Sequence, residues 1–211
     1  IKNGKIVVLN MNIAEYKNLS KIIAAYLKLD FQSEVMSNLS KSKVKPSVFI
    51  CDEYAEYATK TDADFFSLSR EAKCINIVST QSYSSLKNTL KDDASVKVII
   101  QNLINKIWFR TDDIFTIEEA QKQLGKEEKT HISKAISENA KETKFNYITN
   151  SFNSKNSSIT ESLNTYTQKD FVYDTNFFTQ ELETFSSLVF LSNGYKILKP
   201  AKLRMFPYFK K

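Results

Sequence analysis

Short apolar runs, separated by helical patterns, organise the first half of the chain. The runs at residues 5–9, 48–51 and 75–78 are rich in β-branched side chains. The run at 48–51 has no polar alternation, which is typical of a strand buried on both faces. Apolar residues at helical spacing between the first two runs predict a long amphipathic helix over residues 14–38. Strand, helix and strand in this order favour a crossover unit, and therefore an α/β fold with a parallel sheet.

The same patterns predict the remaining elements. Asp62 is expected to cap a helix over residues 62–73. The turn dipeptide Asn193-Gly194 between two apolar runs predicts a β-hairpin near the end of the chain. The further ranges are helices at 83–90, 95–103, 116–124 and 177–185, a fourth strand at 106–109, hairpin strands at 188–191 and 195–198, and an edge strand at 203–206.

Two carboxylates, Asp52 and Glu53, follow the apolar run 48–51 directly. Ligands of open α/β sheets bind outside the carboxyl ends of the strands. There the first acid could hold Mg²⁺ through its water shell, and the second could orient or deprotonate an attacking water. This is the form of a Walker B strand. Two solvated acids beside a turn account for the same residues equally well, so both interpretations stay open at this point.

A polar cluster, Ser79 to Ser82, ends the run 75–78 and contains Gln81. If the strands at 48–51 and 75–78 are neighbours, Gln81 lies next to Asp52 and Glu53. A glutamine amide can hydrogen-bond both a γ-phosphate and an attacking water without taking a proton. The alternative is that Gln81 helps to cap the following helix.

Composition narrows the classes of function. Hydrophobic residues make up 42% of the 211 residues, which supports a packed core, and no apolar run is long enough to span a membrane. Cys51 and Cys74 lie in apolar stretches and indicate buried free thiols in a reducing compartment. The single histidine, His131, has no ligand spacing around it, which argues against a His/Cys metal site. The net charge of +6 allows an anionic partner but does not require one.

Glycine is scarce, with only Gly4, Gly125 and Gly194 in the chain. The 211 residues therefore contain no G-x-x-x-x-G-K-[ST] phosphate-binding loop. If Asp52 and Glu53 form a Walker B pair, their phosphate loop is expected upstream of Ile1, on another chain, or nowhere. Because the first residue is Ile1 and not Met, we expect the chain to be a fragment.

We expect three regions along the chain. Residues 1–145 are predicted to form a partial ATPase-like core that carries the acid pair. Residues 146–170 are rich in Ser, Asn and Thr, and such polar sequence predicts a loop or linker. Residues 171–211 are predicted to add a helix and a β-hairpin that complete the sheet.

Several segments, taken together, resemble a known family. The matching runs are Cys51-Asp52-Glu53-Tyr54, residues 66–74 with Arg70, residues 79–86 with Gln81, residues 4–9, residues 105–111, and Leu124-Gly125 followed by Glu127. They are similar to the C-terminal half of the motor domain of conjugative coupling proteins of the TraD/TraG type, relatives of the FtsK/HerA translocases with a RecA-like P-loop fold. The resemblance covers residues 2–133 well and 177–208 loosely.

The resemblance implies a role for each matching residue. Asp52 matches the Walker B aspartate that binds Mg²⁺, Glu53 the glutamate that activates water, and Gln81 the glutamine that senses the γ-phosphate of ATP. Arg70 matches the position from which family members supply an arginine finger to the nucleotide of a neighbouring subunit. Such an arginine is worth on the order of 10³–10⁵ in rate.

The resemblance also implies a setting. It suggests an ATP-driven translocase that works as a hexameric ring on the cytoplasmic face of the bacterial inner membrane. That translocase would deliver single-stranded DNA to the conjugation channel. Its protein partners would be relaxosome and type IV secretion proteins. The chain departs from the family in three ways. It lacks the Walker A loop, it lacks the membrane helices, so that any membrane contact would lie in segments absent from this chain, and Ser69 replaces a frequent glycine.

Two other interpretations remain. One is a non-hydrolysing remnant of the same fold that only binds partners such as relaxosome or secretion proteins. The other is a different P-loop class, such as a pump for double-stranded chromosomal DNA. The reading frame upstream of Ile1 separates the first of these from a motor, and the strand preference of the full-length protein separates the second. Without a phosphate loop, the 211 residues alone are expected not to hydrolyse ATP.

Overall fold

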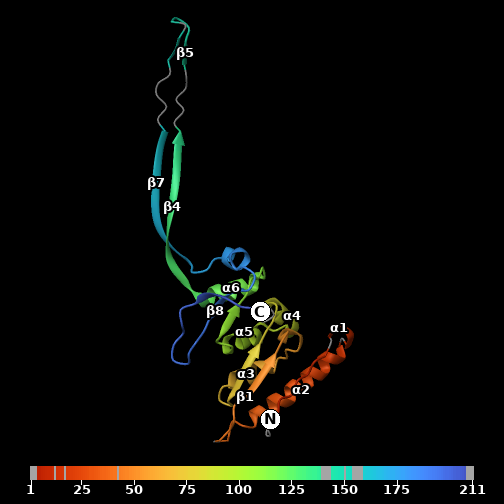
Figure 1. Cartoon of the computed structure of the whole chain (residues 1–211). Helices are drawn as coiled ribbons and strands as arrows, with labels where there is room; N and C mark the ends of the chain where they lie inside the picture. The colour runs from red at the N-terminus through yellow and green to blue at the C-terminus, as the bar shows by residue number, and fades with distance from the viewer. Residues whose placement is uncertain are drawn as a thin grey trace.

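The computed structural model describes residues 4–11, 13–16, 18–41, 43–138, 144–149, 151–153 and 159–207. It consists of a body of mixed helices and strands from which one long β-hairpin projects (Figure 1). The helices are α1 (Ile13–Tyr16), α2 (Asn18–Met36), η1 (Tyr54–Glu56), α3 (Asp62–Leu68), α4 (Tyr83–Leu90), α5 (Asp93–Asn102), α6 (Ile114–Leu124) and the π-helical turn η2 (Phe177–Glu181). The strands are β1 (Ser47–Cys51), β2 (Cys74–Val78), β3 (Lys106–Trp108), β4 (Lys126–Glu138), β5 (Lys144–Asn146), β6 (Ser151–Asn153), β7 (Ile159–Phe171), β8 (Ser186–Phe190) and β9 (Ala201–Arg204).

The expectation of a parallel sheet is confirmed by β1 and β2, which the sequence left only as possible neighbours and which pair in parallel from Ser47↔Cys74 to Cys51↔Val78. The prediction that β1 is buried on both faces is wrong. Burial alternates along β1, and the side chain of Ile50 is 72% exposed. The described helices cover only one face of the pair, where Phe49 packs against Phe31 of α2 with ring centroids 5.6 Å apart.

Residues 5–9 do not form the strand that their apolar pattern predicts. They lie outside any strand of the described chain, and the side chain of Ile6 is 91% exposed. A β-branched run becomes a strand only when another strand supplies its backbone hydrogen bonds. Here no described strand lies in register with residues 5–9.

The long helix is confirmed as α2, but its predicted apolar face is buried only in the C-terminal part, where Val35 has no exposed surface. The side chains of Leu19, Ile22 and Tyr26 are exposed, whereas Lys28 and Gln32 are buried. The reason is a polar partner, because Asp62 of α3 accepts hydrogen bonds from both buried side chains. Hydrophobic periodicity alone therefore predicted the helix and the packing of its C-terminal part, but not the buried polar contacts of Lys28 and Gln32.

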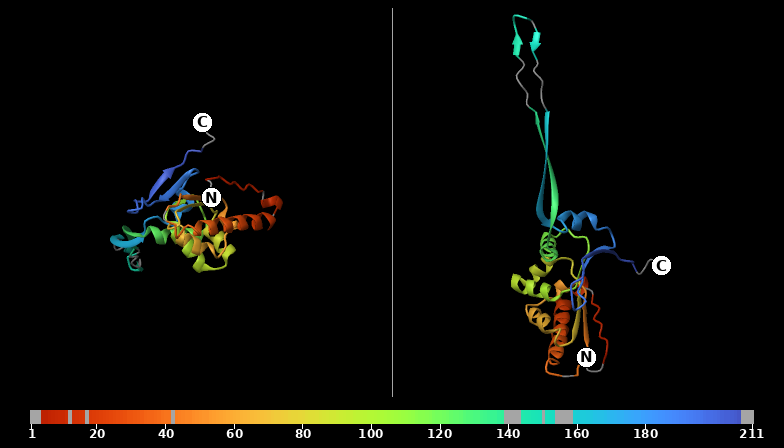
Figure 2. Two further views of the ribbon diagram at one scale, coloured as in Figure 1. Left: turned by 90° about the horizontal axis from the view of Figure 1, so that it is seen from below. Right: turned by 90° about the vertical axis from the view of Figure 1, so that its left-hand side faces the viewer.

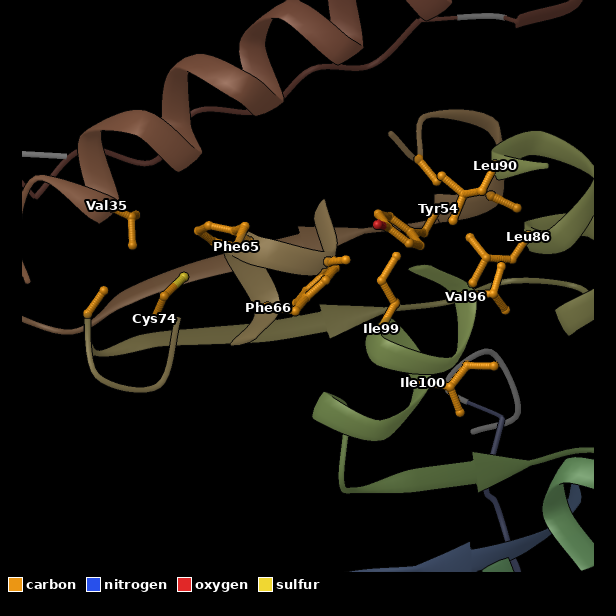
Figure 3. Close-up of a cluster of buried hydrophobic side chains, with 14 residues drawn as sticks. Val35, Tyr54, Phe65, Phe66, Cys74, Leu86, Leu90, Val96, Ile99 and Ile100 are labelled. Carbon is orange, nitrogen blue, oxygen red and sulfur yellow. The ribbon is translucent and has the colours of Figure 1, made fainter. Parts of the chain in front are cut away.

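A first hydrophobic cluster joins α3, α4 and α5 to the covered face of the β1–β2 pair (Figure 3). Phe65 and Phe66 of α3 meet Val96 and Ile99 of α5 in this cluster, and all four are buried. Because the cluster lies directly beneath the parallel pair, it fixes where the carboxyl ends of β1 and β2 lie.

A second cluster lies around a separate antiparallel sheet with the strand order β3-β8-β9. Trp108 of β3 and Leu188 of β8 are buried there against Phe178 of η2. The strand predicted at 106–109 therefore pairs with the end of the chain and not with the parallel pair. The fold is mixed α/β, with a small parallel sheet of two described strands.

The predicted terminal hairpin has its turn in the expected place but not its return strand. The Asn193 side chain accepts hydrogen bonds from the backbone of Tyr195 and Lys196, which closes the turn. A single bridge, Ser192↔Ile197, follows, and regular pairing with β8 resumes only at Ala201. The return strand at 195–198 was therefore a wrong prediction, and β9 takes that role.

The projecting hairpin, hereafter the arm, is formed by β4 and β7 with β5 and β6 near its tip (Figures 1 and 2). β4 and β7 pair antiparallel from Lys126↔Phe171 to Glu138↔Ile159. The prediction of a loop over residues 146–170 is wrong at 151–153, where β6 lies, and from 159 onward, where β7 lies. Ser and Asn set that prediction, but Thr and Ile recur along the same stretch, and β-branched side chains favour strands.

Candidate functional site

The candidate site lies where β1 and β2 end side by side. The backbone N–H of Ser79 donates to the carbonyl of Cys51 at 3.0 Å, and the N–H of Tyr54 donates to the carbonyl of Ser79 at 2.8 Å. These two bonds continue the parallel pairing beyond the strands. They hold the residues that follow β1, Asp52 and Glu53, beside those that follow β2.

Asp52 is held by a hydroxyl and by a backbone N–H. The Ser79 hydroxyl donates to Oδ1 of Asp52, and the N–H of Glu53 donates to the same oxygen at 3.0 Å. The other carboxylate oxygen, Oδ2, accepts no hydrogen bond from the described residues. This contact of Ser79 was not predicted from the sequence. It could have been inferred from the strand register, because Cys51 pairs with Val78 and the next residues, Asp52 and Ser79, therefore lie side by side.

Glu53 adopts a left-handed backbone conformation, with φ 50° and ψ 42°. For a residue with a side chain this conformation costs about 1–2 kcal/mol, and it persists where the surrounding structure imposes it. The turn directs the Glu53 side chain toward β2, where Nε2 of Gln81 donates to its Oε1 at 3.3 Å. The structure thus brings Asp52, Glu53 and Gln81 together at one edge of the sheet.

A shallow polar groove of about 620 Å³ extends from Gln81 toward the N-terminus of α6. Asp113 caps that helix by accepting from the N–H of Thr116 at 2.9 Å, and it also accepts from the hydroxyl of Ser84. Burial alone would raise the pKa of Asp113, but these hydrogen bonds hold the pKa below its usual range. The groove gives a ligand at the acid pair room to extend past α4.

Arg70 lies at the other edge of the parallel pair. It is exposed in the turn between α3 and β2, ahead of Cys74, the first residue of β2. A five-residue strand at ~3.3 Å per residue spans roughly 16 Å. Figure 3 shows Cys74 and Tyr54 at opposite ends of the strand pair. The structure therefore does not bring Arg70 to Asp52, Glu53 and Gln81 of its own chain.

A buried ion pair lies beneath the turn that carries the acids. The Lys28 ammonium contacts both carboxylate oxygens of Asp62, at 2.8 and 2.5 Å, and both side chains are almost fully buried. Burial lowers the pKa of Lys28. Burial alone would raise the pKa of Asp62, but the Lys28 charge and hydrogen bonds from Lys28, Tyr54 and Thr59 hold it below its ordinary value.

The prediction that Asp62 caps α3 was wrong, because the N-cap position is Thr61.

The two cysteines are free thiols, as predicted. Cys74 is buried and Cys51 is half-buried beside the acid pair. Burial raises the pKa of each thiol to about 11. Both therefore stay protonated near neutral pH, and neither is suited to act as a nucleophile.

The described residues hold no cluster of three or more His, Cys, Asp or Glu side chains that could bind a metal by themselves. An Mg²⁺ ion usually keeps several waters and uses one or two carboxylates together with substrate phosphates. Asp52, with one carboxylate oxygen free of described hydrogen bonds, fits that kind of binding. Within the described chain, no helix combines the length and apolar character needed to cross a bilayer.

Comparisons with known proteins give two results. A family model described as the TraM recognition site of TraD and TraG matches residues 46–172, which is more than half of the chain. Among solved structures, the bacterial conjugative coupling protein TrwBdeltaN70, in its unbound monoclinic form, is similar with a TM-score of 0.51 and 16% identity. That match covers 83% of this chain and 35% of the solved chain, so this chain corresponds to about a third of that protein. No curated protein matches.

Proposed function

Because the chain belongs to the family described as the TraM recognition site of TraD and TraG, we propose that it is part of an ATP-driven DNA translocase, a coupling protein that delivers single-stranded DNA to a type IV secretion channel. The observation that carries the proposal is the meeting of Asp52, Glu53 and Gln81 at the carboxyl edge of a parallel pair, with Gln81 Nε2 3.3 Å from Glu53 Oε1.

Each residue at this edge takes one task. Asp52 holds Mg²⁺ through water, and the ion supplies charge neutralisation to the phosphates of bound ATP. Glu53 orients the attacking water and accepts its proton. Gln81 donates its amide N–H groups to the γ-phosphate or to that water, and the contact with Glu53 keeps the two groups on the same side of the substrate.

Arg70 acts on the nucleotide of a neighbouring subunit. Arg70 lies at the end of the strand pair opposite the acid pair, so it cannot serve the site of its own chain. Because its side chain is exposed, it is available to a neighbouring subunit. A ring of such subunits, hexameric in this proposal, puts the Arg70 edge of one subunit against the acid edge of the next. An arginine supplied in this way stabilises the charge that develops during phosphoryl transfer.

The partners in this proposal are DNA and proteins of the transfer machinery, at the cytoplasmic face of the inner membrane. Single-stranded DNA would bind through its phosphates, with little sequence preference and with affinity that falls steeply as salt rises. The family description, a recognition site for TraM, supports a relaxosome-related protein partner. Membrane contact would come from segments outside this chain.

The same description supports a second candidate, a module that keeps the fold but only binds partners. The absence of a G-x-x-x-x-G-K-[ST] motif from the 211 residues fits this candidate as well as it fits the second half of a motor. The two differ in one measurable property, which is ATP hydrolysis by the full-length protein.

The test is the Glu53→Gln variant of the full-length protein. We expect ATP hydrolysis to be abolished while nucleotide binding stays largely intact, because the amide cannot accept the proton of water but keeps the shape of the side chain. Glu56→Gln is the matched control, since Glu56 is three residues away and pairs with Lys21 at the surface. Loss of nucleotide binding in Glu53→Gln would make Glu53 structural, and undiminished hydrolysis would refute the proposal.

A further inference from the structure

A buried polar cluster lies directly beneath the acid turn. Asp62 has no exposed surface and accepts hydrogen bonds from four residues of three different segments. Lys28 and Gln32 of α2 donate to it, at 2.5 and 3.0 Å, and so do the Tyr54 hydroxyl at 2.6 Å and the Thr59 N–H at 3.0 Å. One carboxylate therefore ties the long helix α2 to the segment that follows Glu53.

Tyr54 is the link between this cluster and the acid pair. It follows Glu53 in the chain, and its side chain is 1% exposed. Its N–H donates to the carbonyl of Ser79, its hydroxyl donates to Asp62, and its ring packs edge-on against Phe66 with centroids 5.8 Å apart. Figure 3 shows the Tyr54 ring within the buried cluster at the end of the strands. Tyr54 is thus fixed at three points.

The neighbour of Tyr54 needs such support. Glu53 has a left-handed backbone, which a residue with a side chain keeps only where its surroundings impose it. The side chain of Glu53 is half-buried, and among the described residues its carboxylate has a single hydrogen-bond partner, Gln81. The direction of its carboxylate therefore depends mainly on the backbone at residues 53 and 54. The bonds made by Tyr54 hold that backbone from its C-terminal side, together with the Glu56 N–H, which donates to the Glu53 carbonyl at 2.9 Å.

Stability alone is a weak explanation for a buried ionic cluster. Replacing a buried ion pair with apolar side chains of similar volume is often neutral or stabilising, so the charges bring no general advantage to the core. A carboxylate with several donors does what an apolar contact cannot, because it fixes the angle of each donor. Of the residues that donate to Asp62, Tyr54 lies nearest to the acid pair along the chain.

We propose that Tyr54, anchored by Asp62 and Lys28, is a positioning residue that holds the Glu53 carboxylate in place for ATP hydrolysis. This inference rests on the proposed function, in which Glu53 activates water. Tyr54 itself touches neither water nor nucleotide in this scheme. It acts through the backbone of Glu53.

The test measures kcat and KM for ATP of the full-length protein with Tyr54→Phe, which removes one hydroxyl and keeps the ring. We expect kcat to fall roughly tenfold to a hundredfold, since displacement of a reacting group by about 1 Å can cost ~100-fold. KM should change little, because a loss confined to the chemical step lowers kcat alone. Asp62→Asn should lower kcat at least as much. Its kcat is calculated per folded molecule, with the folded fraction measured by circular dichroism.

Two variants are controls. Gln32→Leu also removes one donor to Asp62, but from the α2 side, and Tyr57→Phe removes a hydroxyl that does not reach Asp62. Both should keep the wild-type kcat. A purely structural cluster would instead make Tyr54→Phe and Gln32→Leu alike.

The outcomes separate this inference from the proposed function. Wild-type kcat in Tyr54→Phe and Asp62→Asn, together with an inactive Glu53→Gln, would overturn the positioning role and leave the ATPase assignment standing. Losses of kcat that only follow the folded fraction would overturn it as well. Undiminished turnover in Glu53→Gln would remove the ATPase assignment itself.

Discussion

The edge of the β1–β2 pair and the arm differ in what surrounds their strands. At the edge, buried groups lie beneath the candidate site, where the Tyr54 hydroxyl donates to Asp62 directly after Glu53 in the chain. Along the arm, β4 and β7 mainly pair with each other, and Ile132 and Leu163 keep 71% and 66% of their surface exposed. The edge is therefore anchored to a hydrophobic core, whereas large apolar side chains of the arm stay exposed.

Cross-strand side-chain contacts lie near the base of the arm, at His131. His131 Nε2 lies 2.5 Å from Oδ2 of Asp170, and its ring stacks on Tyr166 with centroids 5.5 Å apart. Cross-strand pairs of this kind contribute roughly 0.2–1 kcal/mol each. Such contacts keep the two strands in register, but they do not replace a hydrophobic core.

The largest expected difference concerns Asp62. Asp62→Ala should lower the free energy of unfolding by about 3–5 kcal/mol, because it leaves the Lys28 ammonium buried without its partner. Urea unfolding of the chain measures this. The double variant Lys28→Met/Asp62→Leu should recover most of the loss. A double variant as unstable as Asp62→Ala would show that the ion pair itself, and not the unpaired charge, determines stability.

Truncation of large apolar side chains should separate the two regions next. Phe66→Ala removes a 3% exposed side chain from the body and should cost about 3–5 kcal/mol. Leu163→Ala on the arm should change stability by less than about 0.5 kcal/mol, because the residue is mostly exposed. Thermal unfolding of both variants provides the comparison. Equal costs would mean that the arm packs against something in solution.

A smaller effect is expected from pH. The pKa of Asp62 is held below its unfolded value, so its stabilising contribution is complete above the unfolded pKa, near 4, and is lost as pH falls through the folded pKa. The melting temperature of the wild type should therefore decrease when the pH is lowered below about 4. Lys28→Met/Asp62→Leu should show a shallower fall. If the melting temperatures of the two proteins decrease equally as the pH is lowered, Asp62 is not the cause.

The contrast also explains which features could be predicted from the sequence. β1, β2 and α4 were predictable because local apolar runs and turn residues determine them, whereas the pairing of β1 with β2 stayed a condition that the structure meets. The burial of Lys28 and Gln32 on α2 was not predictable, because it depends on Asp62, which lies 34 residues from Lys28. β7 was missed because Ser and Asn outweighed the β-branched residues in a reading based on composition.

The acid edge shows the same division. Asp52, Glu53 and Gln81 could be placed together because parallel strands end at the same edge. The left-handed turn at Glu53 and the buried support from Tyr54 could not, because both depend on contacts between distant segments. The roles of Asp52, Glu53, Gln81 and Arg70 stay predictions that only activity measurements can test.

A mixing experiment tests most directly whether the acid edge of one subunit works with the arginine of another. Full-length Arg70→Ala and Glu53→Gln are each expected to be almost inactive in ATP hydrolysis. When the two are combined before assembly, some interfaces pair an intact Glu53 with an intact Arg70. The account predicts that the mixture hydrolyses ATP well above the sum of the separate proteins. A mixture no more active than that sum, although mixed assemblies form, would contradict it.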